Sequence, residues 1–473
     1  MRRGHVQIQP RARVQHRPVV DELVLQPQNL FYGIAFSHGQ NTTTVTNFCH
    51  QSYGYKEASF GPIFAPLRVE SFSVKGRGDG ATDEARTTRR EARRVLEERA
   101  RAAGFDLVGV TGAEPLKRGG ERLTEWQEAG MAADMGFMHR PAGLLADPKR
   151  LQKSARSVVS LGVSYYPGDH PADEGGGRVA RYAWGQDYHV VIKERLKALR
   201  AELEEALGCR IKARAFTDAV PLLERSAAQH AGLGFFGRNS CLINGRIGSY
   251  FFIADLIVDL DLEPDTEGEG TCGKCARCMQ GCPTGAIKAP GVVDARLCIS
   301  YLTIENRGPI PRELRAKVGD WAFGCDVCQE VCPYNKRKAT VSSWPEFSAG
   351  AGAGPYLEIP EVLGIRDDEE FEARFAGTPL TRPGRAGLLR NCCVAAGNLG
   401  LGEAVPALVR CLAEDESALV RGHAAWALGE IGGGAAAEAL EAALGDEAEA
   451  SCLEEIRLAL ENIASPVGKS GLE

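Results

Sequence analysis

Eight of the chain's fifteen cysteines fall into two runs whose spacing matches the ligands of iron–sulfur clusters. The first run reads C-x2-C-x2-C-x3-C-P, which is the spacing of bacterial ferredoxin-type [4Fe–4S] sites. The second run has the shorter form C-x2-C-x3-C-P, and an isolated upstream cysteine supplies the missing thiolate. The first run is Cys272, Cys275, Cys278 and Cys282, and the second set is Cys298, Cys325, Cys328 and Cys332.

Eight thiolates are the number that two [4Fe–4S] clusters require. In sites of this type three cysteines of a run hold one cluster and the fourth serves the other. Zinc is the competing interpretation because C-x2-C pairs also bind zinc, but the proline that ends both runs favours iron. Two neighbouring clusters are typical of an electron-transfer path that ends at another redox cofactor or a substrate. We predict one cluster on Cys272, Cys275, Cys278 and Cys332, and another on Cys282, Cys298, Cys325 and Cys328.

A second block of residues that could carry out chemistry is TDAVPLLERSAAQHAGLGFFGRNSCLI, residues 217–243. It joins the acid Asp218 to a Glu224-Arg225 pair and then to a glycine-rich aromatic loop. An aspartate beside a buried cofactor can serve as a proton donor. An aspartate at the start of a loop is, however, commonly a cap or turn residue, so this block alone leaves both interpretations open.

The composition is that of a globular protein with more than one domain. A chain of 473 residues is too long for a single core. It has no uninterrupted apolar stretch of about 18 residues, and no apolar segment follows its first arginines. We therefore expect no membrane span, no export signal and a reduced, cytoplasmic setting for the cysteines. The net charge of −6 does not by itself indicate a nucleic-acid partner.

Helices and strands interleave before the cysteine-rich segment. A helix is expected from Glu91 to a stop at Gly104, because this stretch is rich in strong helix formers. An amphipathic helix is expected over residues 190–207. Three apolar segments read as strands: residues 105–110, 157–166 and 249–260. The pattern predicts an α/β or α+β domain through about residue 262.

The last eighty-odd residues are rich in alanine and leucine and repeat with a period of 32. Stepping by that period from Val394 gives Trp426 and Leu458, and the residues next to them align as well. Pairs of helices with a fixed period predict a HEAT-like solenoid. A plain helical bundle is the alternative.

Taken in order, several motifs make the chain resemble the epoxyqueuosine reductases over roughly residues 91–465. They are RYAWGQDYH, FTDAVPLLERSAAQHAGLGFFGRNS, the eight cysteines, GRAGLLRNCCVAAGN and the terminal repeats. The resemblance implies a cobalamin- and iron–sulfur-dependent enzyme, related to reductive dehalogenases. It implies the last step of queuosine synthesis, in which an epoxide on the wobble base of tRNA is reduced to an alkene.

The resemblance also implies roles for individual residues. Asp218 would protonate the departing epoxide oxygen, with a pKa raised by burial. Arg225 would position substrate or cofactor, and Arg140, Arg181 and Tyr188 would line the cobalamin pocket together with Asp218. Without the resemblance, each arginine would be read as an ordinary solvated side chain. The cobalamin is expected base-off, and the electrons from a ferredoxin or flavodoxin.

The expected tRNA partner conflicts with the charge of the C-terminal segment. From Asn391 to the end there are fourteen Asp and Glu against four Lys and Arg, a net of −10. Such a surface repels phosphate, so contacts with tRNA would have to come from local patches of basic side chains. The alternative is that these basic side chains are ordinary solvated residues. The candidates are Arg382, Arg385, Arg390, Lys336, Arg337, Lys338, Arg312 and Arg315.

The resulting expectation is an α+β fold: a nitroreductase-like cobalamin-binding domain, a bacterial ferredoxin-like two-cluster module and an all-α HEAT-like domain, in a monomer. A corrinoid reductive dehalogenase-like enzyme and a non-enzymatic electron carrier are the competing functions. The expected parts are a disordered or over-called extension at 1–88, the catalytic domain at 89–265, the cluster module at 266–345, and a linker with repeats at 346–470.

Overall fold

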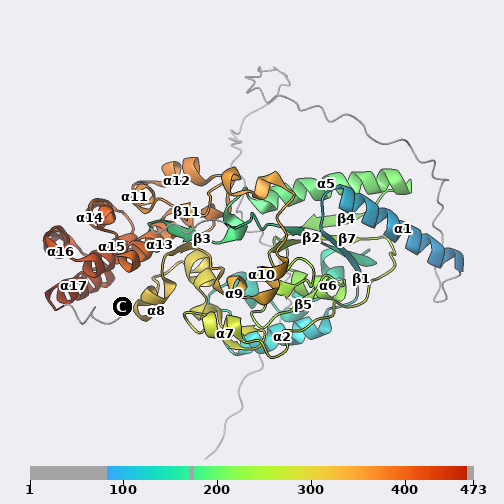
Figure 1. Cartoon of the computed structure of the whole chain (residues 1–473), viewed down its shortest axis with the longest axis horizontal. Coiled ribbons are helices and arrows are strands. Elements are labelled where there is room, and N and C mark those ends of the chain that lie inside the picture. Colours follow the sequence, from blue (N-terminus) through green and yellow to red (C-terminus); the bar gives the residue numbers. More distant parts are fainter. Residues whose placement is uncertain (1–82, 170–174, 466–473) are drawn as a thin grey trace, which may run out of the picture. The chain divides into compact units, whose positions relative to one another are not determined.

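The computed structural model describes residues 83–169 and 175–465 (Figure 1). The expected extension at 1–88 lies outside these residues except for its last six positions, which belong to helix α1 (Asp83–Ala102). The helix therefore begins earlier than Glu91. Ion pairs explain the difference, because Arg89 contacts Asp261 at 3.0 Å and so ties the first half of α1 to the chain after the sheet.

The part of the chain before the cysteine-rich segment is built on a four-stranded sheet in the order β1-β2-β7-β4, antiparallel throughout (Figure 1). This confirms the prediction of a mixed helix-and-strand domain. The three predicted strands appear as β1, β2 and β7. The strands are β1 (Leu107–Gly112), β2 (Ser157–Ser164), β4 (Ala213–Phe216) and β7 (Phe251–Val258).

Both faces of this sheet are covered by helices. Side chains alternate between the faces of a strand, so Val159 and Leu161 of β2 pack with α1 and with α5 (Tyr188–Leu207). Val158, the residue before Val159, packs on the opposite side with Ala227 of α6 (Glu224–His230). Helix α2 (Lys117–Glu128) and the short helices α3 (Ala142–Leu145) and α4 (Pro148–Leu151) follow β1.

The cysteine-rich segment is made of short elements separated by turns. A hairpin of β5 and β6 precedes it, and β8 pairs with β9 within it. The elements are β5 (Phe235–Phe236), β6 (Leu242–Ile243), α7 (Arg277–Gly281), β8 (Ile287–Ala289), β9 (Val292–Val293), α8 (Arg312–Val318), α9 (Val327–Glu330) and α10 (Pro333–Lys338).

A small sheet joins three distant parts of the chain. Strand β3 (Gly177–Val179) pairs in parallel with β10 (Trp321–Phe323) and antiparallel with β11 (Tyr356–Leu357). These strands come from the segments assigned to the catalytic domain, the cluster module and the linker. Gly177 lies close to β10: a Cβ atom there would meet the Cβ of Ala322 at 2.9 Å. The three segments therefore fold as connected parts.

The C-terminal helices form the repeat predicted from the period of 32. Helices α13, α15 and α17 pack in succession, while α14 packs against α16. Gly397 and Gly429, one period apart, let neighbouring helices approach, because a Cβ on Gly397 would meet the Trp426 ring at 2.7 Å. The helices are α11 (Ile359–Val362), α12 (Asp368–Phe375), α13 (Gly384–Leu399), α14 (Val405–Glu414), α15 (Ala418–Ile431), α16 (Gly434–Asp446) and α17 (Ala450–Ala464).

A buried arginine–asparagine pair fixes the first repeat helix to the cluster module. Arg390 is fully buried and donates to the carbonyls of Leu302, Asn306 and Gly308 at 2.6–2.8 Å. Asn391 donates to the carbonyls of Thr303 and Ala322. The segment between Cys298 and Cys325 is therefore braced by α13. In the described part of the chain, no helix has the length and apolar character needed to cross a bilayer.

Candidate functional site

Four of the predicted cluster ligands line one hollow of about 430 Å³. Cys272, Cys275 and Cys278 reach it from the loop before α7 and from α7 itself, and Cys332 reaches it from the residue before α10. Cys282, the fourth cysteine of the first run, does not line this hollow. The assignment of these four thiols to one cluster stays a prediction, and this hollow is where that cluster would lie.

The other four cysteines influence one another electrostatically. Burial, and then the nearby Cys328 and Cys282, raise the pKa of Cys298. Burial raises the pKa of Cys325, with smaller contributions from Cys328 and Cys298. The two sets are neighbours as well, because Cys328 of the second set adds to burial, the main cause, in raising the pKa of Cys278. In residues 83–169 and 175–465, no three metal-binding side chains converge tightly enough for a single ion.

The thiol chemistry of these sets fits iron–sulfur clusters. A four-iron cluster needs four thiolates around a space larger than one metal ion occupies, and the first set surrounds such a space. A further cysteine, Cys241, was missed by the spacing argument. Its hydrogen bond with Cys328 is the largest cause of the raised pKa of Cys328.

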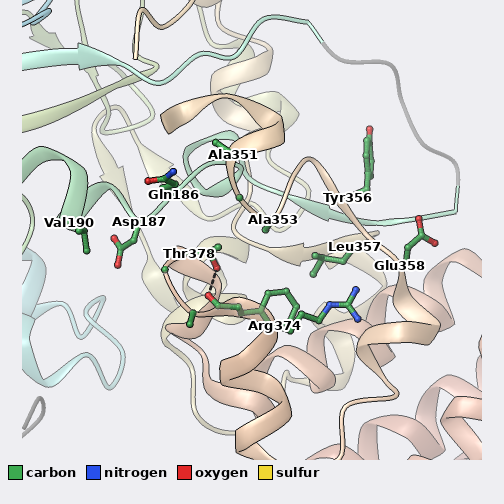
Figure 2. A pocket seen from close by; sticks show the side chains of 14 residues that line it. Gln186, Asp187, Val190, Ala351, Ala353, Tyr356, Leu357, Glu358, Arg374 and Thr378 are labelled. Carbon is green, nitrogen blue, oxygen red and sulfur yellow. Dashed lines mark hydrogen bonds between the residues drawn. The ribbon is translucent and has the colours of Figure 1, made fainter. Parts of the chain in front are cut away.

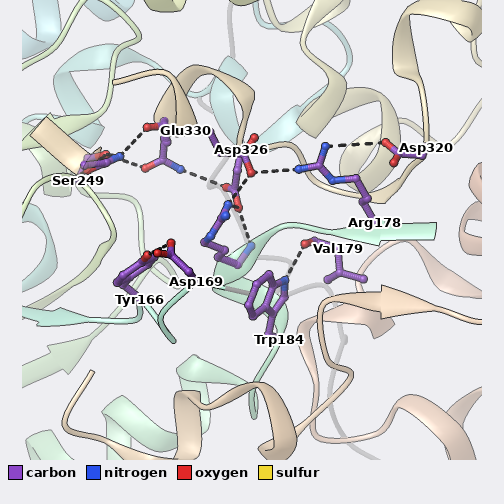
Figure 3. Close-up of polar contacts among 12 residues, drawn as sticks. Tyr166, Asp169, Arg178, Val179, Trp184, Ser249, Asp320, Asp326 and Glu330 are labelled. Atoms are coloured by element: carbon purple, nitrogen blue, oxygen red, sulfur yellow. Dashed lines mark hydrogen bonds and ion pairs between the residues drawn. The ribbon is translucent and has the colours of Figure 1, made fainter. Parts of the chain in front are cut away.

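Arg181 links the part of the chain before the cysteine-rich segment to Asp326 and Glu330, which flank the second cysteine set and are labelled in Figure 3. Its backbone N–H donates to Asp326, between Cys325 and Cys328, at 2.7 Å. Its guanidinium donates to Glu330 at 2.7 Å and lies 5.4 Å from the centre of the Tyr250 ring. Its Nε is buried and has no hydrogen-bond partner in the part of the chain that the structure describes.

Asp218 lies at the end of β4 with a positive φ of 51°, and its side chain is exposed. The Tyr188 hydroxyl donates to its Oδ2 at 2.9 Å. Its backbone N–H donates to Oε1 of Glu224 at 2.7 Å. The burial that was expected to raise the pKa of Asp218 is therefore not present in this structure; two neighbours instead fix the residue in an unusual backbone conformation.

Tyr188 is itself rigidly held. It is the first residue of α5, is buried, and stacks on Phe252 with ring centres 4.3 Å apart. Burial, and then Asp218, raise the pKa of the Tyr188 hydroxyl and of the neighbouring Tyr182 hydroxyl. Both hydroxyls therefore keep their protons, and that of Tyr188 acts as a donor toward Asp218.

Two further carboxylic acids lie behind Asp218. Glu224 is half-buried, and burial followed by Asp255 and Asp218 raises its pKa. Asp255 in the centre of β7 is fully buried, and burial raises its pKa to about 7, although its Oδ1 accepts a 2.5 Å hydrogen bond from Ser160. Its Oδ2 is buried without a partner among the described residues. Like-charged neighbours in low dielectric favour retention of a proton by this pair.

The remaining predicted cofactor residues are not in contact with Asp218. Arg225 donates to the backbone carbonyl of Ser240 at 2.5 Å. Arg140 is exposed at the end of a short 3-10 helix, and its carbonyl accepts from Gln127 at 2.9 Å. Arg382, which the cofactor assignment did not include, lies near enough to Asp218 that this carboxylate raises its pKa. Its main partner is Glu305.

Three of the basic residues considered for tRNA contact are internal, so these assignments were wrong. Arg390 is buried among carbonyl groups, Arg315 is buried and paired with Glu455 at 2.6 Å, and Arg385 is buried and paired with Asp415 at 2.5 Å. Arg312 also contacts Glu455. Arg385 and Arg390 lie in the repeat helix α13, and Arg312 and Arg315 lie in α8, so these side chains stabilise the fold. Arg382, Lys336, Arg337 and Lys338 remain exposed.

A separate hollow of about 610 Å³ lies between the start of α5 and the end of α12 (Figure 2). Gln186, Asp187, Val190, Arg374 and Thr378 are among its lining residues. It includes none of the cysteines and none of the predicted cofactor residues. Sequence reasoning gave no signal for it, because its walls come from segments about 190 residues apart.

Comparison with known proteins gives three family matches. Residues 271–335 match a 4Fe-4S double cluster binding domain, residues 146–219 match "Epoxyqueuosine reductase QueG, DUF1730", and residues 385–461 match HEAT repeats. The chain is 39% identical over 339 residues to the epoxyqueuosine reductase of Xanthomonas campestris, covering 70% of this chain and 94% of that protein. It is 37% identical over 342 residues to that of Pseudomonas aeruginosa, covering 69% and 91%.

Solved structures give the same result. The chain superposes on epoxyqueuosine reductase bound to an epoxyqueuosine-modified tRNA-Tyr stem loop with a TM-score of 0.73 and 32% identity, covering 79% of this chain and 99% of that one. A Bacillus subtilis epoxyqueuosine reductase with its catalytic loop swung out of the active site gives a TM-score of 0.72 and 32% identity, covering 78% and 98%.

Proposed function

The chain belongs to the epoxyqueuosine reductase family, and from this premise we propose how its residues reduce epoxyqueuosine to queuosine at the wobble position of tRNA. The reaction removes the epoxide oxygen. Both C–O bonds break, a C=C bond forms, and two electrons and two protons leave with the oxygen as water. The protein must therefore supply electrons one at a time and protons at the oxygen.

Asp218 is the proton donor in this proposal. The observation that supports it is the pair of hydrogen bonds that hold this exposed acid, one from Tyr188 to its carboxylate and one from its own N–H to Glu224. Oδ1 of Asp218 accepts no hydrogen bond from the described residues, so it is open toward a ligand. An acid fixed in this way can meet the epoxide oxygen as its bond to carbon breaks.

The eight cysteines hold the iron–sulfur centres, as two [4Fe–4S] clusters in the predicted sets. Cobalamin, bound base-off, is the proposed electron-rich group next to the substrate, and when bound it supplies the reducing power at carbon. Arg181 fits the margin of such a site because its buried Nε has no partner among the described residues, and its guanidinium donates to Asp326 and Glu330 beside the second cysteine set. Tyr188, Asp218, Arg225 and Arg140 complete the proposed lining.

We propose the domain roles, the location and the oligomeric state as well. The catalytic half carries the nitroreductase-like cobalamin site, and the protein acts as a cytoplasmic monomer. The proposed parts remain 89–265 for the catalytic domain, 266–345 for the cluster module and 346–470 for the linker and repeats. Exposed Arg382, near Asp218, is the basic residue best placed to meet a tRNA phosphate.

The decisive experiment is complementation of a strain that lacks this gene. Mass spectrometry of its digested tRNA is expected to show epoxyqueuosine in place of queuosine, and the intact gene restores queuosine. The Asp218→Asn gene is expected to leave epoxyqueuosine, although the purified variant keeps the iron and corrinoid content of the parent. Normal queuosine in the deleted strain would refute the function; normal queuosine with Asp218→Asn would refute only the role of Asp218.

A further inference from the structure

The hollow of the first cysteine set has a strongly basic lining. Arg238, Arg277, Arg337 and Lys338 line it together with the four thiols, and no aspartate or glutamate does. Lys274 and Lys336 lie beside these residues in the sequence and are exposed. We call these six residues the basic rim. The carboxylates nearest to the rim in sequence, Glu269 and Glu330, do not line the hollow.

Within the described residues, the rim gathers six cations that form no ion pair. Many arginines in the described ranges pair with a carboxylate, but none of the rim residues takes part in an ion pair there. Arg238 donates only to the backbone carbonyl of Gly273, at 2.8 Å. A concentration of unpaired charge of one sign creates a field that attracts an oppositely charged partner.

Neutralisation of the cluster does not require the whole rim. A cluster on four thiolates is an anion, and the cations that line the hollow compensate part of that charge. Arg277, Arg337 and Lys338 are nevertheless exposed to solvent, and Lys274 and Lys336 are outside the lining. Positive charge therefore remains at the outer surface, where a partner can meet it.

The position of the two sets indicates the direction of electron flow. The first set lies under exposed residues, including Thr271, Gly273 and Arg277. In the second set, Cys325 packs against the large core shared with the repeats, and the intervening Asp326 holds Arg181 of the catalytic half. Electrons that arrive from outside therefore enter at the first set and leave toward the catalytic half from the second.

We infer that the basic rim is the docking surface for an acidic one-electron donor protein of the ferredoxin or flavodoxin class. The inference rests on the proposed function, because that reaction consumes two electrons that the chain itself cannot regenerate. A tRNA is the competing occupant. Its modified base must reach Asp218, where Arg382 is the neighbouring exposed cation, whereas the rim surrounds thiols that no base needs to reach.

The test uses the holoenzyme with Lys274→Glu and Lys336→Glu combined, because these two exposed rim residues do not line the hollow. With reduced flavodoxin or ferredoxin as donor, we expect kcat/KM for the donor to fall at least tenfold. The rate of the parent enzyme should fall as the salt concentration rises, and we expect this dependence to disappear in the variant. With dithionite as reductant, turnover is expected to stay within twofold of the parent, as are iron content and the Kd for a modified tRNA stem loop.

The matched control carries the same charge change elsewhere: Lys193→Glu and Lys197→Glu, two exposed residues of α5. It should behave as the parent with both reductants. If the rim variant loses iron, the neutral pair Lys274→Gln and Lys336→Gln replaces it.

A rim variant with weaker stem-loop binding and an unchanged donor KM would assign the rim to RNA and overturn the inference. An equal loss with dithionite and with the donor protein would overturn it too. Failure of the proposed function is a different result, since the parent enzyme would then not reduce epoxyqueuosine with any reductant.

Discussion

The Tyr188 hydroxyl donates a 2.9 Å hydrogen bond to Oδ2 of Asp218, so a buried, stacked side chain orients an exposed acid thirty residues away. Asp218 has a left-handed backbone conformation, with a φ of 51°, that a non-glycine residue adopts only when its surroundings impose it. The contact explains how a loop acid can keep a fixed direction without being buried.

Tyr188→Phe is therefore expected to lower kcat for epoxyqueuosine reduction by about tenfold, because the carboxylate loses its directing partner. The fold should persist, since the ring still stacks on Phe252. Steady-state kinetics and the melting temperature measure the two effects. Tyr166→Phe is the control: it removes a hydroxyl that donates to Asp169 at 2.5 Å and should leave kcat unchanged.

Glu224 is expected to act as a positioning residue for the same loop. Glu224→Ala leaves the Asp218 N–H without its acceptor and should lower kcat more than it raises KM. Glu224→Gln keeps an amide oxygen that can accept this bond and should recover most of the activity. Equal activity of the alanine and glutamine variants would show that this hydrogen bond does not matter for turnover.

Asp255 makes the stability of the protein depend on pH. Burial raises its pKa from 3.8 to about 7. Below the pKa that Asp255 has in the unfolded chain, its contribution to the free energy of unfolding is complete. That contribution is lost as the pH rises through the pKa in the folded state. The loss amounts to up to about 4 kcal/mol between pH 4 and 7. The Ser160 hydrogen bond opposes this shift, and burial followed by Asp255 raises the pKa of the neighbouring Glu224.

Asp255→Asn should remove this dependence. We expect the variant to be more stable than the parent toward urea at pH 8, where Asp255 is charged and its Oδ2 has no partner among the described residues. The difference should shrink at pH 5.5. A difference in stability between parent and variant that stays the same from pH 5.5 to pH 8 would contradict the assignment.

Arg390→Met is expected to destabilise the protein by about 3 kcal/mol or more, because it leaves the carbonyls of Leu302, Asn306 and Gly308 buried without a donor. Iron content should fall with stability, since these carbonyls belong to the segment between Cys298 and Cys325. Arg382→Met is the matched control. It breaks an exposed pair with Glu305, which contributes less than about 1 kcal/mol.

The crossover pairing of cysteines predicts a specific pattern of iron loss. Cys275→Ala and Cys332→Ala should each remove about half of the iron, and together they should remove no more, because both residues serve one cluster. Combining Cys275→Ala with Cys325→Ala should remove nearly all of it. Anaerobic purification, iron analysis and EPR spectroscopy measure these outcomes. Additive loss in the first double variant would refute the pairing.

The sequence by itself determined the parts of the protein that depend on local spacing. The C-x2-C-x2-C-x3-C-P run indicated iron–sulfur chemistry, because thiolates at these intervals suit one cluster. The period of 32 predicted the repeat helices, and apolar runs predicted β2 and β7. These signals are periodic or contiguous, so they can be read without knowledge of distant contacts. The resemblance carried by the motif around Asp218 indicated the reaction.

Only the tertiary structure decided which residues meet. Arg390 looked like a phosphate contact in the sequence and is instead a buried brace, since a guanidinium pairs with whichever acceptors the fold brings near it. Tyr188 and Asp218, and the sheet formed by β3, β10 and β11, join positions far apart in the chain. Contacts of this kind depend on how the connected segments pack, and neither residue type nor spacing encodes them locally.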